Sequence, residues 1–392
     1  MRRSRVVLLI SSLAVVGFLL GSGAALKAGA GDGTFRQMLL FSEVLSYAVD
    51  NYVDPVDTDR LMRGAQDGLM SGLDSHGAYL TPGDVDLWKR GAASTTDAAE
   101  PGMSVLKNGP VLQVISVFTG SPAETATLAV GDQIRKIDGQ SVRAISLDQA
   151  LRRLRGPAGT TVDLDVFRVK DLKREVVKVA RAVRHDAPYV LELNGGVAVL
   201  TIRDFDRLPT DGLVAELAAV KDRGADRLLV DVRDAASLNT RRASGIADLF
   251  ASGTFLRLSD KNGHAIETLS GTRAKPVWAG AVAVLVNGAT AGAGEGLAMI
   301  LRDRKKAAIY GEPTYGLGTE PRLVELPEGG GLLVPGYIWE TPAGKRWNAD
   351  GLSPDKVVKS DGRRDDADDD QLKKTIEDFG KVEAAEAAPK AA

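Results

Sequence analysis

The chain of 392 residues contains no cysteine and only three histidines. Without cysteine it can form neither disulfide bonds nor thiolate metal sites, and it cannot use a thiol as a nucleophile. The histidines, His76, His185 and His264, lie far apart in the sequence, which argues against a zinc site and against a Ser-His-Asp triad. No metal ion and no other cofactor is therefore expected.

An excess of charge of either sign is also missing. The 50 Lys and Arg residues nearly balance the 52 Asp and Glu residues, and the formal net charge is −2. Proteins that bind nucleic acid usually carry a clear excess of positive charge, so no nucleic-acid partner is expected. Hydrophobic residues make up 44% of the chain, a fraction that is normal for globular proteins, and the length predicts two or three domains.

The N-terminus has the pattern of an export segment. Arg2, Arg3 and Arg5 precede an uncharged run of 21 residues, Val6–Leu26, which is about the length that spans a bilayer. Small residues at 28–30 offer a cleavage site. Residues 1–30 are therefore expected to be a cleaved signal peptide or a retained anchor in the inner membrane. The positive N-terminus predicts that the body of the chain lies on the exported side, in the cell envelope.

Helical and strand patterns divide the rest of the chain. Apolar residues recur at helical spacing from Phe35 to Tyr52 and again after Thr58, so residues 31–95 are predicted to be a helical region. From residue 185 to residue 360, strands and helices alternate, which predicts an α/β core domain. Within it, Leu332–Pro335 and Tyr337–Trp339 are interpreted as two paired strands. Residues 361–392 are rich in aspartate and then in alanine. Leu372, Ile376 and Phe379 have the spacing of one short helix, but the tail is predicted to be disordered or frayed.

The stretch from Val282 to Thr319 carries the clearest motif. A buried strand, a turn of small residues, a helix, a second strand and a Gly-rich loop form one βαβ-like unit. The stretch resembles the active-site segment of the carboxyl-terminal processing (tail-specific) proteases, a serine-type family with a PDZ domain. This resemblance implies a core with a sheet like that of the crotonases and the Clp proteases. The whole chain is then a multidomain α/β protein.

The positions that this resemblance assigns to catalysis carry other residues. The nucleophilic serine of the family falls on Gly292, its lysine base on Leu317 and the glutamine that orients the lysine on Pro321. The Pro-Gly-Gly of the oxyanion loop falls on residues 236–238, which include Ser237 and Leu238. Nucleophilic catalysis needs an attacking atom and an adjacent base, and neither is present at these positions. The sequence therefore predicts a member of the family without catalytic activity.

Residues 100–184 resemble a PDZ domain. The strongest motifs are Gly120–Glu124, Val130–Ile134 and Ile137–Gln140, in the order typical of this domain, and Ser146–Leu154 is predicted to be the helix beside the groove. A PDZ groove binds the extended C-terminus of a protein as an added strand. The resemblance implies that the peptide is bound by Gly102, Met103, Ser104, Val105, Leu147 and Leu151. Ser104 departs from the glycine that the family usually has in this loop.

Three hypotheses about function follow. The first is a catalytically inactive homologue that binds protein C-termini through its PDZ groove or associates with an active protease of the same family. The second is an active serine-type endopeptidase with relocated residues, for which Thr290 is the best substitute nucleophile and Lys305 or Lys306 the nearest base. The third is a structural homo-oligomer in which the PDZ domain is a spacer that binds nothing.

Overall fold

The computed structural model describes residues 32–74, 76–89, 99–143, 145–327, 329–360 and 369–386. The chain divides into two compact units, Met1–Ala65 and Gln66–Ala392. Helix α2 (Asp32–Asn51) lies in the first unit, and α3 (Thr58–Ser71) begins there, as the helical periodicity predicts. The expected signal peptide or anchor lies outside the described residues. Among the helices that are described, none is long and apolar enough to cross a membrane.

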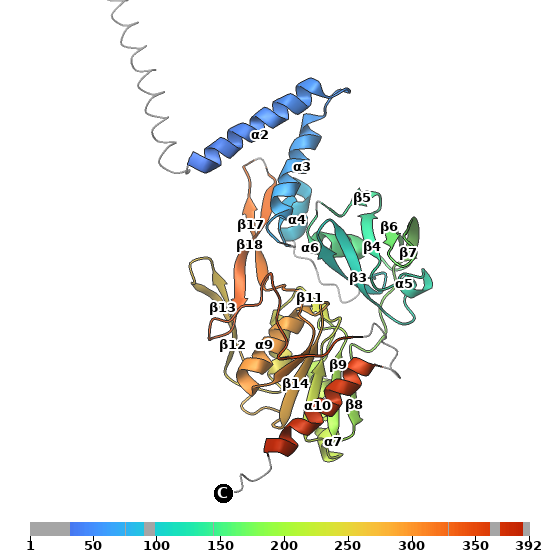
Figure 1. Cartoon of the computed structure of the whole chain (residues 1–392), viewed down its shortest axis with the longest axis vertical. Coiled ribbons are helices and arrows are strands. Elements are labelled where there is room, and N and C mark those ends of the chain that lie inside the picture. The colour runs from blue at the N-terminus through green and yellow to red at the C-terminus, as the bar shows by residue number, and fades with distance from the viewer. Residues whose placement is uncertain are drawn as a thin grey trace, which may run out of the picture. The chain divides into compact units, whose positions relative to one another are not determined.

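The region that resembles a PDZ domain is a β-sheet flanked by two short helices (Figure 1). The strand order is β2-β3-β4-β6-β7, with β5 paired to β4, so β2 lies at an edge of the sheet. Helix α6 begins after Ser146, which forms a capping box with Gln149. The elements are β2 (Met103–Asn108), β3 (Val111–Val117), α5 (Pro122–Thr125), β4 (Gln133–Ile137), β5 (Gln140–Ser141), α6 (Leu147–Leu154), β6 (Thr161–Arg168) and β7 (Lys173–Ala180).

The core domain is a mixed α/β layer structure, as the sequence predicts. Its sheet has the order β19-β16-β14-β10-β9-β8, with β8 antiparallel to β9 and the other pairs parallel. Its elements are β8 (Tyr189–Asn194), β9 (Val197–Ile202), α7 (Thr210–Asp222), β10 (Arg227–Asp231), α8 (Arg241–Ala247), β14 (Ala281–Val286), α9 (Ala293–Lys305), β16 (Ala308–Gly311) and β19 (Lys356–Val357).

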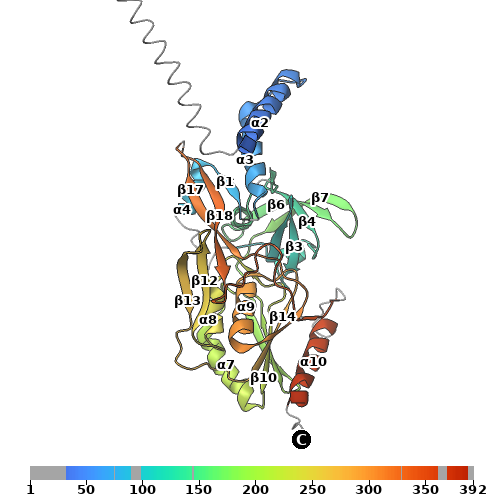
Figure 2. The ribbon, with the colours of Figure 1, turned by 60° about the vertical axis from the view of Figure 1, so that its left-hand side comes forward.

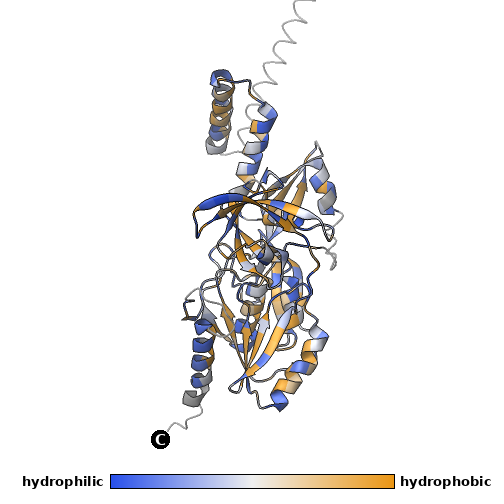
Figure 3. Ribbon diagram, turned by 90° about the vertical axis from the view of Figure 1, so that its right-hand side faces the viewer, coloured by the Kyte–Doolittle hydropathy of each residue, from blue (hydrophilic) through white to orange (hydrophobic). Residues whose placement is uncertain are grey.

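Both faces of this sheet are buried, and hydrophobic strands fill its centre (Figure 3). Ala198 and Leu200 of β9 face a core that includes α7, α8 and α9. Val197 and Val199 of the same strand point to the opposite face. Strands that are covered on both sides need continuous apolar runs, which explains why β9 and β14 show no polar alternation.

The prediction of a disordered tail is wrong for Asp370–Glu386, which form helix α10. Figure 2 shows α10 on the side of the sheet opposite to α7, α8 and α9. Leu372, Ile376 and Phe379 recur at helical spacing and pack against the second face of the sheet. The acidic block suggested a solvated segment, but these three residues give the helix an apolar face that covers the sheet.

A second sheet contains β1 (Ala78–Leu80), β18 (Gly331–Glu340), β12 (Thr254–Asp260), β13 (Ala265–Ser270) and β17 (Thr319–Glu325), and helix α4 (Pro82–Lys89) follows β1. Here the prediction of two paired strands at 332–339 is wrong, because β18 runs through both segments. Pro335 lies opposite Pro321, next to an irregularity in the pairing of the two strands. Since neither proline has an N–H group to donate, a strand can continue through this position without an unpaired donor.

Candidate functional site

The family's nucleophile position lies in a short parallel strand pair that the sequence did not predict. Strand β11 (Ala236–Ser237) pairs with β15 (Ala291–Gly292), and Ser237 is opposite Gly292. Gly292 has φ 57° and ψ −105°, a conformation that side-chain-bearing residues rarely adopt. A Cβ atom on Gly292 would lie 2.0 Å from the carbonyl oxygen of Ser237. In this conformation, position 292 has no room for any side chain.

Glu295 joins the two loops that carry the former nucleophile and base positions. Its side chain is fully buried, and Oε2 accepts hydrogen bonds from the backbone N–H groups of Gly292 (2.9 Å) and Leu317 (2.8 Å). Oε1 accepts from the N–H of Gly316 (2.7 Å) and from the hydroxyl of Thr314. Burial raises the pKa of Glu295 to about 7, and these four donors oppose that rise.

Sequence reasoning did not identify Glu295 as the residue that holds this site together. The available signal was its position in the first turn of α9, where a glutamate commonly accepts from the helix N-cap. The contacts to Gly316 and Leu317 could not be derived in this way, because those residues are more than 20 positions away in the sequence.

Leu317, at the base position, is almost entirely buried (4% exposed). It belongs to the hydrophobic cluster of the PDZ-like region, which also includes Val105 and Leu147. Its backbone is fixed by Glu295, and its Cδ2 would lie 3.5 Å from a Cβ on Gly292. An apolar side chain that packs between the two domains therefore takes the place of a catalytic amine.

The relocated residues of the second hypothesis do not come together. Thr290 is fully buried, its hydroxyl donates to the carbonyl of Val232 (2.9 Å), and it accepts from the N–H of Asn287 (3.0 Å). Lys305 and Lys306 lie at the far end of α9, roughly 18 Å from its start at 1.5 Å per residue. Their amines contact the carbonyl groups of Ala279 and Asp303.

Ser237 and Leu238, at the oxyanion-loop positions, have structural contacts. The hydroxyl of Ser237 donates to Asp206 (3.1 Å), and burial raises the pKa of this aspartate. Leu238 packs against the PDZ-side cluster. His76 is buried, burial lowers its pKa, and its Nε2 atom has no hydrogen-bond partner among the described residues. Within the described residues, no lysine or histidine nitrogen is hydrogen bonded to Thr290 or Ser237, and no group of His, Asp and Glu could hold a metal ion.

Five of the six predicted peptide-binding residues line one cavity of about 240 Å³. These are Met103, Ser104, Val105, Leu147 and Leu151. The cavity continues to Ser237, Leu238 and Leu317 of the core domain, so the groove and the positions that the resemblance assigns to catalysis line one space. Gly102 does not line it. With φ 82° and a Cβ position only 2.4 Å from the Ser121 Cβ, Gly102 instead forms the turn that leads into β2.

Comparison with known proteins agrees with this architecture. Residues 196–358 match the sequence model of peptidase family S41, and residues 113–168 match that of the PDZ domain. Over most of its length the chain is similar to carboxyl-terminal processing proteases. It is 26% identical over 337 residues to the carboxy-terminal-processing protease of Bartonella bacilliformis, covering 83% of this chain and 76% of that protein. It is 34% identical over 252 residues to the carboxyl-terminal-processing protease of Picosynechococcus sp., covering 63% and 61%.

The chain also shares its fold with a solved structure. The photosystem II D1 C-terminal processing protease aligns with a TM-score of 0.60 and 23% identity, over 82% of this chain and 92% of that chain. The chain spans about three quarters of the length of the Bartonella protein and less than two thirds of the Picosynechococcus protein.

Proposed function

We propose that this homologue does not hydrolyse peptide bonds. The observation that carries the proposal is the close approach at position 292, where the Cβ atom of any nucleophilic residue would lie only 2.0 Å from the carbonyl oxygen of Ser237. Leu317 adds no group that can accept a proton. The peptidase mechanism of the family requires both functions. The buried, hydrogen-bonded hydroxyl of Thr290 speaks against the alternative of an active endopeptidase with a relocated nucleophile.

The function we propose instead is the binding of protein C-termini. Strand β2 lies at the edge of its sheet, next to a cavity lined by Met103, Val105, Leu147 and Leu151. An extended peptide can pair with such an edge while its side chains enter the part of the cavity that these apolar residues line. Because the same cavity reaches Leu317, a bound C-terminus would lie against the former active site without being cut.

This activity is expected in the cell envelope, on the exported side, because Arg2, Arg3 and Arg5 precede the long uncharged segment. If the chain associates with an active protease of the same family, that protease would degrade the protein whose C-terminus is bound. A reporter enzyme that works only in the cytoplasm, fused after Val358, should be inactive. An active reporter would contradict the proposed location.

Self-association is a second proposal, and the first compact unit favours it. Helix α2 exposes large apolar side chains, including Phe35 (56%), Met38 (66%) and Tyr47 (61%). Apolar residues in this density on one helix commonly mark a protein contact. Light scattering on the full chain and on a Phe35→Ser, Met38→Ser, Tyr47→Ser variant tests this. We expect an oligomer for the first and a smaller species for the second.

The test of peptide binding uses the purified full chain and fluorescein-labelled decapeptides that end in Ala, Val, Leu or Phe. Each is made with a free C-terminus and as its amide. We expect binding of free-acid peptides with apolar last residues, with affinities on the order of micromolar, and weaker binding of the amides. Equal binding of both forms, or no binding of any peptide, would contradict the proposal.

A further inference from the structure

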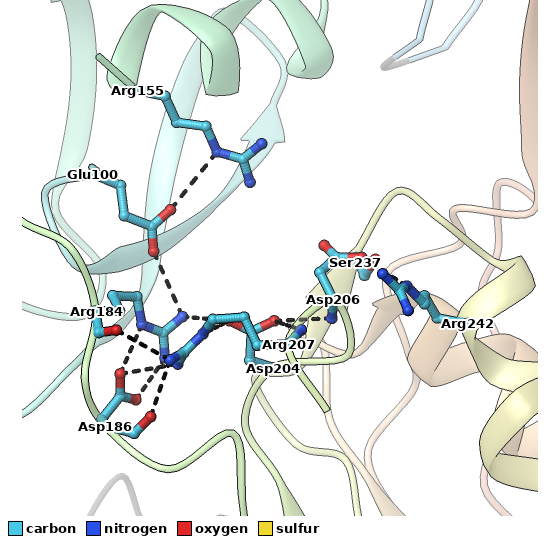
Figure 4. Close-up of polar contacts among 9 residues, drawn as sticks. All are labelled: Glu100, Arg155, Arg184, Asp186, Asp204, Asp206, Arg207, Ser237 and Arg242. Carbon is cyan, nitrogen blue, oxygen red and sulfur yellow. Dashed lines mark hydrogen bonds and ion pairs between the residues drawn. The ribbon is translucent and has the colours of Figure 1, made fainter. Parts of the chain in front are cut away.

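A group of charged side chains lies at the end of the groove where β2 begins. It joins the PDZ-like region to the core domain, since its members come from both and from the segment between them (Figure 4). The Glu100 cluster, as we name it, consists of Glu100, Arg155, Arg184, Asp186, Asp204 and Arg207. Four of these residues, Glu100, Arg155, Arg184 and Asp204, also line the cavity of about 240 Å³.

One part of the Glu100 cluster is tightly bonded. Arg184 donates two hydrogen bonds to Asp186 (2.9 and 2.6 Å) and one to Asp204 (2.9 Å), and its guanidinium lies 3.7 Å from the centre of the Phe118 ring. Arg207 donates to the same two aspartates, at 2.8 Å to Asp204 and 3.0 Å to Asp186. Two arginines thus face two aspartates with good hydrogen-bond geometry, and this part is electrically balanced.

Glu100 and Arg155 are held differently. The Glu100 carboxylate lies 3.6 Å from Nη1 of Arg184 and 3.8 Å from Nε of Arg155, and both distances are too long for hydrogen bonds. The Glu100 side chain is only 22% exposed, whereas that of Arg155, just after the end of α6, is 41% exposed. Burial also raises the pKa of Glu100. Among the described residues, this mostly buried carboxylate therefore lies between two arginines at ion-pair distance, without a hydrogen bond to either.

The position of Glu100 relative to a bound peptide follows from strand geometry. A peptide that pairs antiparallel with the free edge of β2 places its last residue beside the start of β2 at Met103. Glu100 is three residues before Met103 and lines the same cavity. The terminal carboxylate of the peptide would arrive next to the Glu100 carboxylate, and two like charges at this distance repel each other.

We propose that Glu100 occupies the place of a ligand's terminal carboxylate, and that Arg155, together with Arg184, receives that carboxylate when a peptide binds. Glu100 then acts as an internal competitor that lowers the affinity for free C-termini. Arg155 is the cation that distinguishes a free C-terminus from a blocked one. The ligand class is an unmodified protein C-terminus with an apolar last residue, because Met103, Phe118 and Leu151 line the adjacent cavity. This inference rests on the proposed function.

The test measures fluorescence anisotropy of the same free-acid and amidated peptides with the full chain. Glu100→Gln removes the competing charge at constant size, and it should tighten binding of the free acids about fivefold without affecting the amides. Arg155→Gln should weaken binding of the free acids by a similar factor and leave the amides unchanged. Arg155→Lys keeps the charge and should retain most of the preference for free acids.

The matched control is Arg153→Gln, which removes one positive charge from α6 at a residue that does not line the cavity. It should leave both classes of peptide unaffected, and the thermal unfolding of each variant verifies that the fold is retained. A preference for free acids that is unchanged by Glu100→Gln and Arg155→Gln would overturn this inference and leave the proposed function intact. Failure of every free-acid peptide to bind wild type and Glu100→Gln would overturn the proposed function itself.

Discussion

The loops around Glu295 and the groove beside β2 differ in which features of a peptidase with a PDZ domain they contain. Around Glu295, the backbone frame of a peptidase site persists through four hydrogen bonds to one carboxylate, although the nucleophile and base positions are Gly292 and Leu317. In the groove, an edge strand lies beside an open cavity that is lined by both apolar and charged side chains. In this comparison, the two loops around Glu295 are held by hydrogen bonds to its buried carboxylate. A reactive side chain at position 292 or 317 is not needed for this arrangement.

We expect the largest loss of stability when the Glu295 carboxylate, which accepts these four hydrogen bonds, is removed. Glu295→Ala leaves three buried N–H groups and one hydroxyl without their partner. Since each unsatisfied buried donor costs about 1–3 kcal/mol, the free energy of unfolding should fall by at least about 4 kcal/mol in urea titrations. Glu312→Ala, in the loop after β16, is the control and should change it by less than about 0.5 kcal/mol. A small loss of stability in Glu295→Ala would show that other contacts hold the two loops around Glu295.

Introducing a side chain at position 292 should have the next largest effect. Gly292→Ala combines a positive φ with a Cβ only 2.0 Å from the Ser237 carbonyl oxygen, so we expect a loss of about 3 kcal/mol in stability. Gly288→Ala is the matched control in the same segment. Its Cβ would have only one neighbour, the Pro313 carbonyl oxygen at an ordinary 3.7 Å. Equal stability of the two variants would contradict the close approach of β11 to β15.

The pH dependence of stability tests the burial of Glu295. Because its pKa is raised from 4.5 to about 7 in the folded protein, its contribution is complete below pH 4.5 and is lost as the pH rises through 7. This rise in pKa corresponds to about 3 kcal/mol, at about 1.4 kcal/mol per pKa unit. The difference in unfolding free energy between wild type and Glu295→Gln should shift by up to this amount over that range. A constant difference would mean that Glu295 remains ionised throughout.

The smallest effect is expected for partial restoration of catalysis. Gly292→Ser with Leu317→Lys supplies a nucleophile and a base, but the serine meets the Ser237 carbonyl and the lysine enters an apolar cluster. We expect turnover of an unstructured protein at or barely above background. Adding Ser237→Gly and Leu238→Gly should increase it, because these changes give the loop the freedom to turn its N–H groups towards an oxyanion. Adding Pro321→Gln should increase it further, because it supplies a side chain that can orient the lysine. Full activity of the double variant would contradict the role assigned to Ser237.

The sequence predicted the elements of the core domain well, because strands such as Val197–Ile202 and the helix after Gly292 carry strong apolar patterns. Five of the six residues assigned to peptide binding line one cavity, while their binding of a peptide stays a prediction. The tail was mispredicted because the apolar face of α10 is short and follows an acidic block. The contacts of Glu295, the Ser237 carbonyl at Gly292 and the Glu100 cluster join residues from distant segments, and no local pattern encodes such contacts.

The central claim is the absence of peptidase activity, and the direct measurement is the cleavage of an unstructured protein substrate by purified wild type and by Thr290→Ala. Position 292 carries no nucleophile, and the hydroxyl of Thr290 is hydrogen bonded to the carbonyl of Val232. Wild type and Thr290→Ala should therefore both leave the substrate intact, as a buffer control does. Cleavage by wild type that disappears in Thr290→Ala would contradict this account and identify Thr290 as the nucleophile.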